Sequence, residues 1–396
     1  MVSESMERIR SVFFSSGWLM PIGIVILFDI GRALGNLGLA IYFIWGLLTL
    51  RRDDFRRDRV ILLLYFCMLA AFALGIPGAV DSTLAFKGWF KFLYTSITFL
   101  FTFAALSVFE ERYERAMRYF QVAAVAAFAV FAGRFFLFVV DGDSGGSAGG
   151  GLEVAWTFPF VIYGIMQKIE HVLARRLMVS FATLVVFVML SQVDSSSEVL
   201  GFSASLLVYA FLSGWNKITI ALVSPILIIL VLLLELYPKL ESAGSVDVME
   251  FMAVWTSGRS VLWSEMLTTD HPSPVFGVGI KNISNNLEEF SRLGVNSAHN
   301  FILSVWYETG WTGLVFFSMF FGWVVGKIRK NYIRMTVKCR GIMVPWLSSI
   351  SFILVVTLVD GYHNSLHFSF ALMFMLALVY DVNEDAYSNE LGGRLE

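Results

Sequence analysis

Charged residues are scarce in this sequence of 396 residues. Asp, Glu, Lys and Arg make up only 15% of the chain, whereas 57% of it is hydrophobic. A soluble domain of this length needs a much larger polar surface. The composition therefore excludes an ordinary soluble fold.

Cysteine and net charge are also nearly absent. The two cysteines, Cys67 and Cys339, form no Cys-x-x-Cys motif, which excludes a disulfide framework and argues against redox chemistry. The formal net charge of −2 gives no reason to expect a nucleic-acid partner. Residues 1–10 are polar and the apolar run after them has no convincing cleavage site, so we expect that run to be a retained span.

Long apolar runs are what the chain has in abundance. About 20 helical residues cross a hydrocarbon core of about 30 Å, and a barrel would instead show roughly ten-residue segments of alternating character. We therefore predict an all-α polytopic membrane protein with about twelve spans. They lie near residues 12–29, 34–50, 60–80, 92–108, 119–140, 152–166, 177–193, 199–213, 218–237, 301–325, 341–359 and 368–380.

The basic residues predict the orientation of these spans, because Lys and Arg in short loops favour the cytoplasm. With the N-terminus inside, 21 of the 29 Lys and Arg residues fall on the cytoplasmic side. The C-terminal tail, 381–396, is then also inside. We expect a bacterial inner (cytoplasmic) membrane protein whose chemistry lies on the periplasmic face.

One outer connection is long, over residues 238–300. Long connections with helices of their own are usually functional, and we expect helices at Val246–Trp255, Ser260–Leu267 and Asn282–Leu293. The predicted parts are thus nine spans in 1–237, a periplasmic catalytic loop in 238–300, three spans in 301–380 and the tail. No convincing internal repeat is present.

Four short motifs follow one another in and just after this loop. Gly258-Arg259 precedes a predicted helix with Trp263, Gly277-Val278-Gly279 follows, His299-Asn300 stands before a span, and Gly310-Trp311-Thr312-Gly313 lies inside it. This succession resembles the O-antigen ligase and polymerase family. The resemblance implies a metal-independent membrane glycosyltransferase without a cofactor. Its partners would be membrane lipids, a glycan donor on undecaprenyl diphosphate and a glycolipid or glycan acceptor.

Chemistry gives roles to two of these residues. A diphosphate leaving group needs neutralisation, and the planar fork of arginine binds phosphate oxygens bidentately, which favours Arg259 and, as a second contact, Arg292. The acceptor hydroxyl gains from a base with a pKa near neutrality, which favours His299. Asn300 either orients this site or binds substrate. The alternatives without a catalytic role are a solvated arginine that helps to start a helix and a histidine that caps the next span.

The sequence also departs from the family. Members commonly carry a Ser-Arg pair facing outward after the seventh span, whereas the corresponding stretch here is Asp194-Ser195-Ser196-Ser197-Glu198. Lys87 and Lys91, in a predicted outer loop over Asp81–Lys91, or Arg134 could supply the missing charge. Arg134 lies inside a predicted span, where it either snorkels outward or faces a polar cavity.

The remaining histidines are weaker candidates. His363 and His367 are four apart and could share one helical face, but such a pair without a supporting carboxylate is weak evidence for a metal site. We expect His363 to line the acceptor cleft or to belong to a polar outer turn, and His271, beside prolines, to be a loop residue.

Other functions remain open at this point. Within the family, a polymerase that extends an O-antigen or exopolysaccharide would use the same loop as a ligase. Outside it, twelve spans would also suit a polysaccharide or lipid transporter, although transporters usually place polar groups near the bilayer midplane. An outer-face sensor without catalysis is a further alternative.

Overall fold

The computed structural model describes residues 24, 32–49, 58–108, 121–122, 125–126, 128–130, 133, 151–191, 196–215, 259–295, 297–360 and 366–380. In these ranges all regular secondary structure is helical, which confirms the predicted all-α class.

Helices overlap nine of the twelve predicted spans. They are α3 (Arg32–Thr49), α4 (Arg59–Ala73), α5 (Ser82–Val108), α7 (Gly151–Lys168), α8 (Val172–Ser191), α9 (Ser196–Leu212), α14 (Phe301–Arg334), α15 (Val337–Asp360) and α16 (Leu366–Tyr380). The predicted spans 12–29, 119–140 and 218–237 lie mostly or wholly outside the described residues. The number twelve therefore stays a prediction.

Two described helices are long and apolar enough to cross a membrane, over Phe301–Arg334 and Arg340–Val359. Shorter apolar helices cover Ala33–Leu47, Arg59–Ala73 and Ser197–Leu212. Several helices also expose apolar side chains at helical spacing. On α3 these are Leu34, Leu37, Ile41, Ile44 and Leu47. Water would disfavour such stripes and lipid would not, which agrees with a membrane environment.

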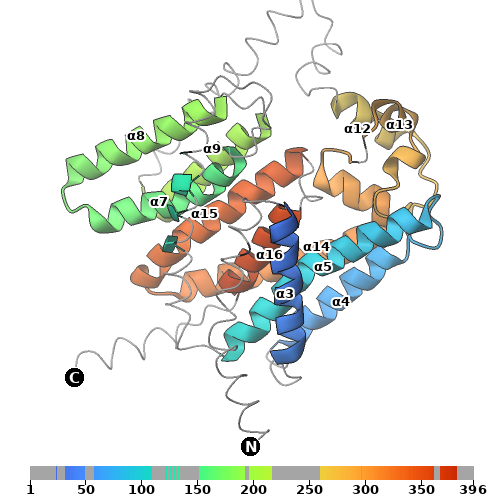
Figure 1. Ribbon diagram of the computed structural model, residues 1–396, viewed down its shortest axis with the longest axis horizontal. Helices are drawn as coiled ribbons and strands as arrows, with labels where there is room; N and C mark the ends of the chain where they lie inside the picture. The colour runs from blue at the N-terminus through green and yellow to red at the C-terminus, as the bar shows by residue number, and fades with distance from the viewer. Residues whose placement is uncertain are drawn as a thin grey trace, which may run out of the picture.

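The helices form two groups that meet along α15 and α16 (Figure 1). In one group α15 packs on α9 and α7; in the other, α14 packs on α4 and α16 packs on α5. A single buried apolar cluster runs through both groups and includes Phe99, Phe202 and Trp346. Because all these helices share one core, the groups form one body.

Hydrogen bonds of polar side chains stabilise one end of the bundle. The distribution of Lys and Arg predicts that this end faces the cytoplasm. Asp58 caps α4, with Oδ1 accepting from Val60 N and Ile61 N at 3.1 and 3.3 Å. Its other oxygen accepts from the Tyr380 hydroxyl at 2.5 Å, and that hydroxyl accepts from Trp323 Nε1 at 3.1 Å. One aspartate thus starts α4 and ties it to α16 and α14.

The start of α5 corrects one prediction. The expected outer loop over Asp81–Lys91 is instead helical from Ser82 onward. Asp81 Oδ1 accepts from Leu84 N at 2.8 Å, as an N-cap residue does. The two lysines suggested a loop by their polarity, but long lysine side chains can lie on the first turns of a helix and extend toward water.

Three short elements follow in the long connection. They are α12 (Arg259–Thr268), the 3₁₀ turn η3 (Ile283–Asn285) and α13 (Glu288–Leu293). The first confirms the helix expected at Ser260–Leu267, whereas the helix expected at Asn282–Leu293 is split in two. Asn282 accounts for the split, because its side chain accepts from Asp81 N at 2.9 Å and donates to Asp81 O at 3.1 Å. The stretch Val246–Trp255 lies outside the described residues.

Candidate functional site

The span after the long loop is a broken helix. Asn300 caps α14, because its side chain accepts from Leu303 N at 3.0 Å. Gly310 then interrupts the helix with φ 66° and ψ −172°, a region that only glycine occupies readily. A break of this kind frees backbone polar groups, which need other partners wherever water is excluded.

The Gly-x-Gly turn of the loop supplies these partners. Four backbone hydrogen bonds join turn and helix: Val278 N to Tyr307 O (3.1 Å), Gly279 N to Glu308 O (2.9 Å), Trp311 N to Pro274 O (2.9 Å) and Thr312 N to Val275 O (3.1 Å). The contact is so close that a Cβ on Gly277 would lie 2.2 Å from Glu308 O. Two of the glycine motifs therefore form a single structural unit.

Glu308 lies at this junction with 4% of its surface exposed. Its Oε1 accepts from Lys281 N at 2.8 Å. Lys281 has a φ of 66°, an unusual value for a residue with a side chain. The carboxylate thus holds the end of the Gly-x-Gly turn in a conformation that the backbone alone disfavours.

His271 holds the beginning of the same turn. Its Nδ1 accepts from Ser273 N at 3.0 Å, so in the neutral ring the proton is on Nε2, which then donates to Tyr307 O at 3.1 Å. The ring also contacts Trp306 and Tyr307, with centroids 5.2 and 4.4 Å away. Burial lowers the pKa of His271 from its ordinary value, and this outweighs the opposing effect of its backbone hydrogen bonds.

His299 and Arg259 are connected through α12. Trp263, one turn after Arg259, donates from Nε1 to Ala298 O at 2.6 Å, directly before His299. His299 has a φ of 48°, and its N–H donates to the Ser297 hydroxyl at 3.3 Å. One hydrogen bond therefore links the helix that carries the arginine to the segment that carries the histidine.

Arg259 also reaches the transmembrane bundle. It is the first residue of α12, and its guanidinium donates from Nη1 to Val359 O at 3.1 Å. Val359 is the penultimate residue of α15. The bond fixes this guanidinium at the end of α15 that the charge pattern places outside.

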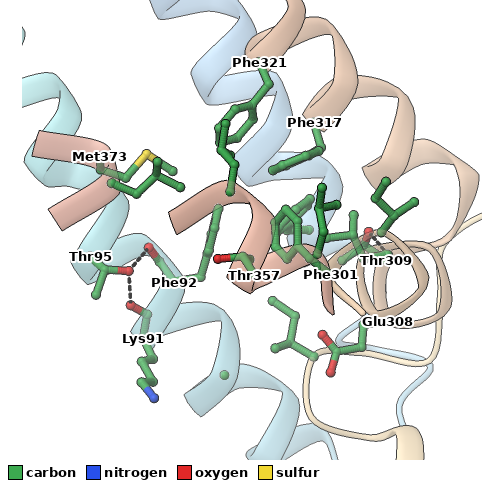
Figure 2. Close-up of a pocket in the computed structure, with 18 of the residues that line it drawn as sticks. Lys91, Phe92, Thr95, Phe301, Glu308, Thr309, Phe317, Phe321, Thr357 and Met373 are labelled. Carbon is green, nitrogen blue, oxygen red and sulfur yellow. Dashed lines mark hydrogen bonds between the residues drawn. The ribbon is translucent and has the colours of Figure 1, made fainter. Parts of the chain in front are cut away.

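A cavity of about 290 Å³ opens among α5, α14, α15 and α16. Its walls are mostly apolar, and its polar lining residues are Lys91, Thr95, Glu308, Thr309 and Thr357. Figure 2 shows Phe317 and Phe321 at one end and Glu308 and Lys91 at the other. Cavities with apolar walls and a few polar groups are the usual form of small-ligand sites.

Neither Arg259 nor His299 lines this cavity, but both adjoin its wall. Phe301 lines it two residues after His299, and Leu358 lines it next to the Val359 carbonyl that Arg259 binds. The segment with His299 thus leads into α14 and Arg259 is bonded to the end of α15, and both of these helices line the cavity.

Residues 179–318 match the family model described as O-antigen ligase. This match supports an O-antigen ligase family assignment. O-antigen ligases are membrane proteins, and the family implies a ligase- or polymerase-type glycosyltransferase that uses a lipid-linked glycan and a glycolipid acceptor. The comparison with curated proteins gave no match.

The other predicted O-antigen ligase site residues are spread more widely. Lys91 lines the cavity from α5, and Lys87, one turn earlier, is exposed. Arg292 is exposed on α13, where its Nε donates to Glu289 Oε2 at 3.0 Å. Arg134 and His363 lie outside the described residues. The roles of all these residues stay predictions.

Glu308, which lines the cavity, and Lys281, which donates to it, had received no role from the sequence. Glu308 was read only as part of the motif around Gly310, and Lys281 only as a basic residue of the long loop. A signal was available for Glu308, because an ionisable side chain within an apolar span marks a functional site by default. No such signal singles out Lys281, whose position depends on the docking of the turn.

Among the described side chains, no group of three or more His, Cys, Asp or Glu residues could hold a metal ion. Whether catalysis is independent of metal stays a prediction, as does the absence of a cofactor.

Proposed function

We propose that this chain is a ligase-type glycosyltransferase of the bacterial inner membrane, with its active site on the periplasmic face. It transfers a glycan from undecaprenyl diphosphate to an outer-leaflet acceptor such as lipid A-core. The reaction forms a bond between the acceptor hydroxyl oxygen and the anomeric carbon and breaks the bond from that carbon to the diphosphate. Arg259 binds the departing diphosphate, and His299 takes the hydroxyl proton.

The observation that supports this proposal best is the cavity lined by α14 and α15, the helices to which these two residues are attached. Its apolar part suits a polyprenyl chain, and its polar end suits a sugar diphosphate. Arginine offers five N–H donors in a fixed fork, and one of them donates to Val359 O, which orients the fork. In a site with little water, a guanidinium stabilises developing phosphate charge more strongly than it would in solution.

The arrangement also disfavours the transporter alternative. Transporters bind their cargo at broken helices near the bilayer midplane. In α14 the loop turn occupies the break and pairs with its freed backbone groups. The break thus serves to dock the loop onto the bundle.

The first prediction tests the two candidate residues in a deletion strain complemented with variants. His299→Ala should lower transfer by about 10²–10⁴-fold, the contribution of a general base, and Arg259→Ala should also abolish long glycan on lipopolysaccharide. Carrier-linked chains should accumulate in both strains. The measurement is the glycan ladder on gels, with membrane protein levels checked by immunoblot.

Matched controls lie at the opposite end of the bundle. His171 and Arg176 are exposed residues near the start of α8, and His171→Ala and Arg176→Ala should leave the ladder unchanged. Normal ladders with both site variants would refute the catalytic roles. If loss of the wild-type gene instead left lipopolysaccharide with a single repeat, the chain would be a polymerase, and if carrier-linked chains failed to reach the outer leaflet, it would be a transporter.

A further inference from the structure

A buried carboxylate at the polar end of the cavity has no part in the chemistry above. Glu308 lines the cavity from α14, inside an apolar helix, with 4% of its surface exposed. Carboxylates in such surroundings are costly unless they are paired or hydrogen-bonded. A purely apolar residue would fill the same space at lower cost, so the buried carboxyl group calls for an explanation.

Among the described residues, only one oxygen of this carboxyl group has a hydrogen-bond partner. Oε1 accepts from Lys281 N at 2.8 Å, and among the described residues no hydrogen bond reaches Oε2. A carboxyl group keeps hydrogen-bond acceptor capacity on its oxygens whether or not it is protonated. Glu308 therefore offers hydrogen-bond acceptor capacity to whatever enters the cavity.

The chemistry of the oxygen selects the part of the substrate that it can meet. A polyprenyl chain has no hydrogen-bond donor, and an ionised diphosphate has none either. The hydroxyl groups of a sugar are donors, and an oxygen of Glu308 can accept from them.

We propose that Glu308 is a glycan-binding residue, whose Oε2 accepts a hydrogen bond from a hydroxyl of the sugar attached to the carrier. The inference rests on the proposed function and refines it. It orients the substrate in the cavity, with the polyprenyl chain toward Phe317 and Phe321, the sugar at Glu308 and the diphosphate near Lys91 and Arg259 (Figure 2).

Two substitutions separate this role from a structural one. Glu308→Gln keeps the size of the side chain and an amide oxygen that can accept from Lys281 N, but it presents an NH₂ group where Oε2 was. Glu308→Ala loses both functions. Glu170→Gln is the control, because Glu170 is exposed in the connection between α7 and α8.

The second prediction concerns binding by the full-length protein in detergent. The probes are carrier-linked glycan extracted from the deletion strain and undecaprenyl diphosphate without glycan. Glu308→Gln should weaken binding of the glycan-bearing lipid on the order of tenfold to a hundredfold, as expected when a buried hydroxyl group loses its acceptor. Its affinity for the bare lipid and its melting temperature should match those of the wild type and of Glu170→Gln.

Every other outcome would contradict either the role of Glu308 or the proposed function. Equal weakening for both lipids, unchanged binding of the glycan-bearing lipid, or a melting temperature as low as that of Glu308→Ala would overturn the role of Glu308. A wild type that binds both lipids equally would also overturn it. A wild type that binds neither lipid would refute the proposed function itself.

Discussion

His271 shows how a single loop residue can stabilise the site without touching substrate. Its two ring nitrogens hold Ser273 and Tyr307, the second of which lies next to Glu308. The hydrogen bond from Ser273 N requires the neutral ring, because protonation of Nδ1 removes the acceptor that Ser273 N uses, whereas Nε2 can donate to Tyr307 O in either state. Burial acts in the same direction, since it lowers the pKa of His271.

The third prediction follows from the sign of that shift. A group whose pKa is lower in the folded state than in the unfolded state contributes stability above the unfolded value, about 6.5 for histidine, and this contribution is lost as the pH falls through the folded value. The apparent melting temperature of the wild type should therefore fall between pH 8 and pH 5. His271→Gln should melt lower at pH 8 and lose less on acidification. Parallel losses in both proteins would contradict this account.

At Lys281 the backbone has an unfavourable conformation that a hydrogen bond to Glu308 stabilises. The unusual backbone of Lys281 costs on the order of 1–3 kcal/mol, and it persists because surrounding contacts impose it. The hydrogen bond from its N–H to a buried carboxylate is one such contact. Strain of this kind gathers at ligand sites, in agreement with a functional cavity beside it.

At the scale of elements, the break in α14 decides where the loop sits. The helix gives up two carbonyls and two N–H groups, and the turn around Gly277 satisfies all four. The docked turn places Ile280 in the cavity wall and Glu308 at its polar end. A continuous helix would offer the turn no free backbone partners.

The fourth prediction tests the contact between the break in α14 and the turn around Gly277. Gly310→Ala puts a Cβ 2.3 Å from Val275 O and forces alanine into a backbone conformation that is nearly exclusive to glycine. We expect a loss of at least about 1–3 kcal/mol, measured as a lower melting temperature of the purified protein, together with loss of glycan transfer. Gly322→Ala, on the same helix with no atom within 4 Å of the new Cβ, should be close to neutral. Similar melting of the two variants would show that the break is not essential.

At the scale of the whole molecule, the exposed apolar stripes and the distribution of Lys and Arg predict a bundle that lies in a bilayer with one orientation. The elements around the candidate site, from α12 to the start of α14, gather at one end of the bundle (Figure 1). The hydrogen bonds among Asp58, Tyr380 and Trp323 lie at the predicted inner end. The charge pattern places the site end outside.

The fifth prediction checks this orientation by thiol labelling in spheroplasts, in a chain whose Cys67 and Cys339 are replaced by serine. A cysteine at Glu288, exposed at the start of α13, should react with a membrane-impermeant reagent from outside. A cysteine at Arg329, exposed near the end of α14, should react only after the membrane is permeabilised. The reverse pattern would place the candidate site in the cytoplasm and exclude a periplasmic transferase.

The sequence alone determined the helical class, nine of the helices, the helix that begins at Arg259 and the family resemblance. These depend on local signals, namely long apolar runs, caps and short motifs in a fixed order. The sequence misplaced the start of α5, where two lysines obscured the local cap at Asp81. It also misplaced the helix expected at Asn282–Leu293, because the bonds between Asp81 and Asn282 join residues about 200 positions apart.

The tertiary structure decided the rest. Only the fold brings Arg259 to Val359, joins Trp263 to Ala298, inserts the Gly-x-Gly turn into the break of α14 and gives Glu308 a cavity to face. Each of these contacts connects helices that are distant along the chain, and no local pattern encodes which side chains meet across them. The types of residue needed for the chemistry can be read from the sequence, whereas their convergence on one cavity depends on packing.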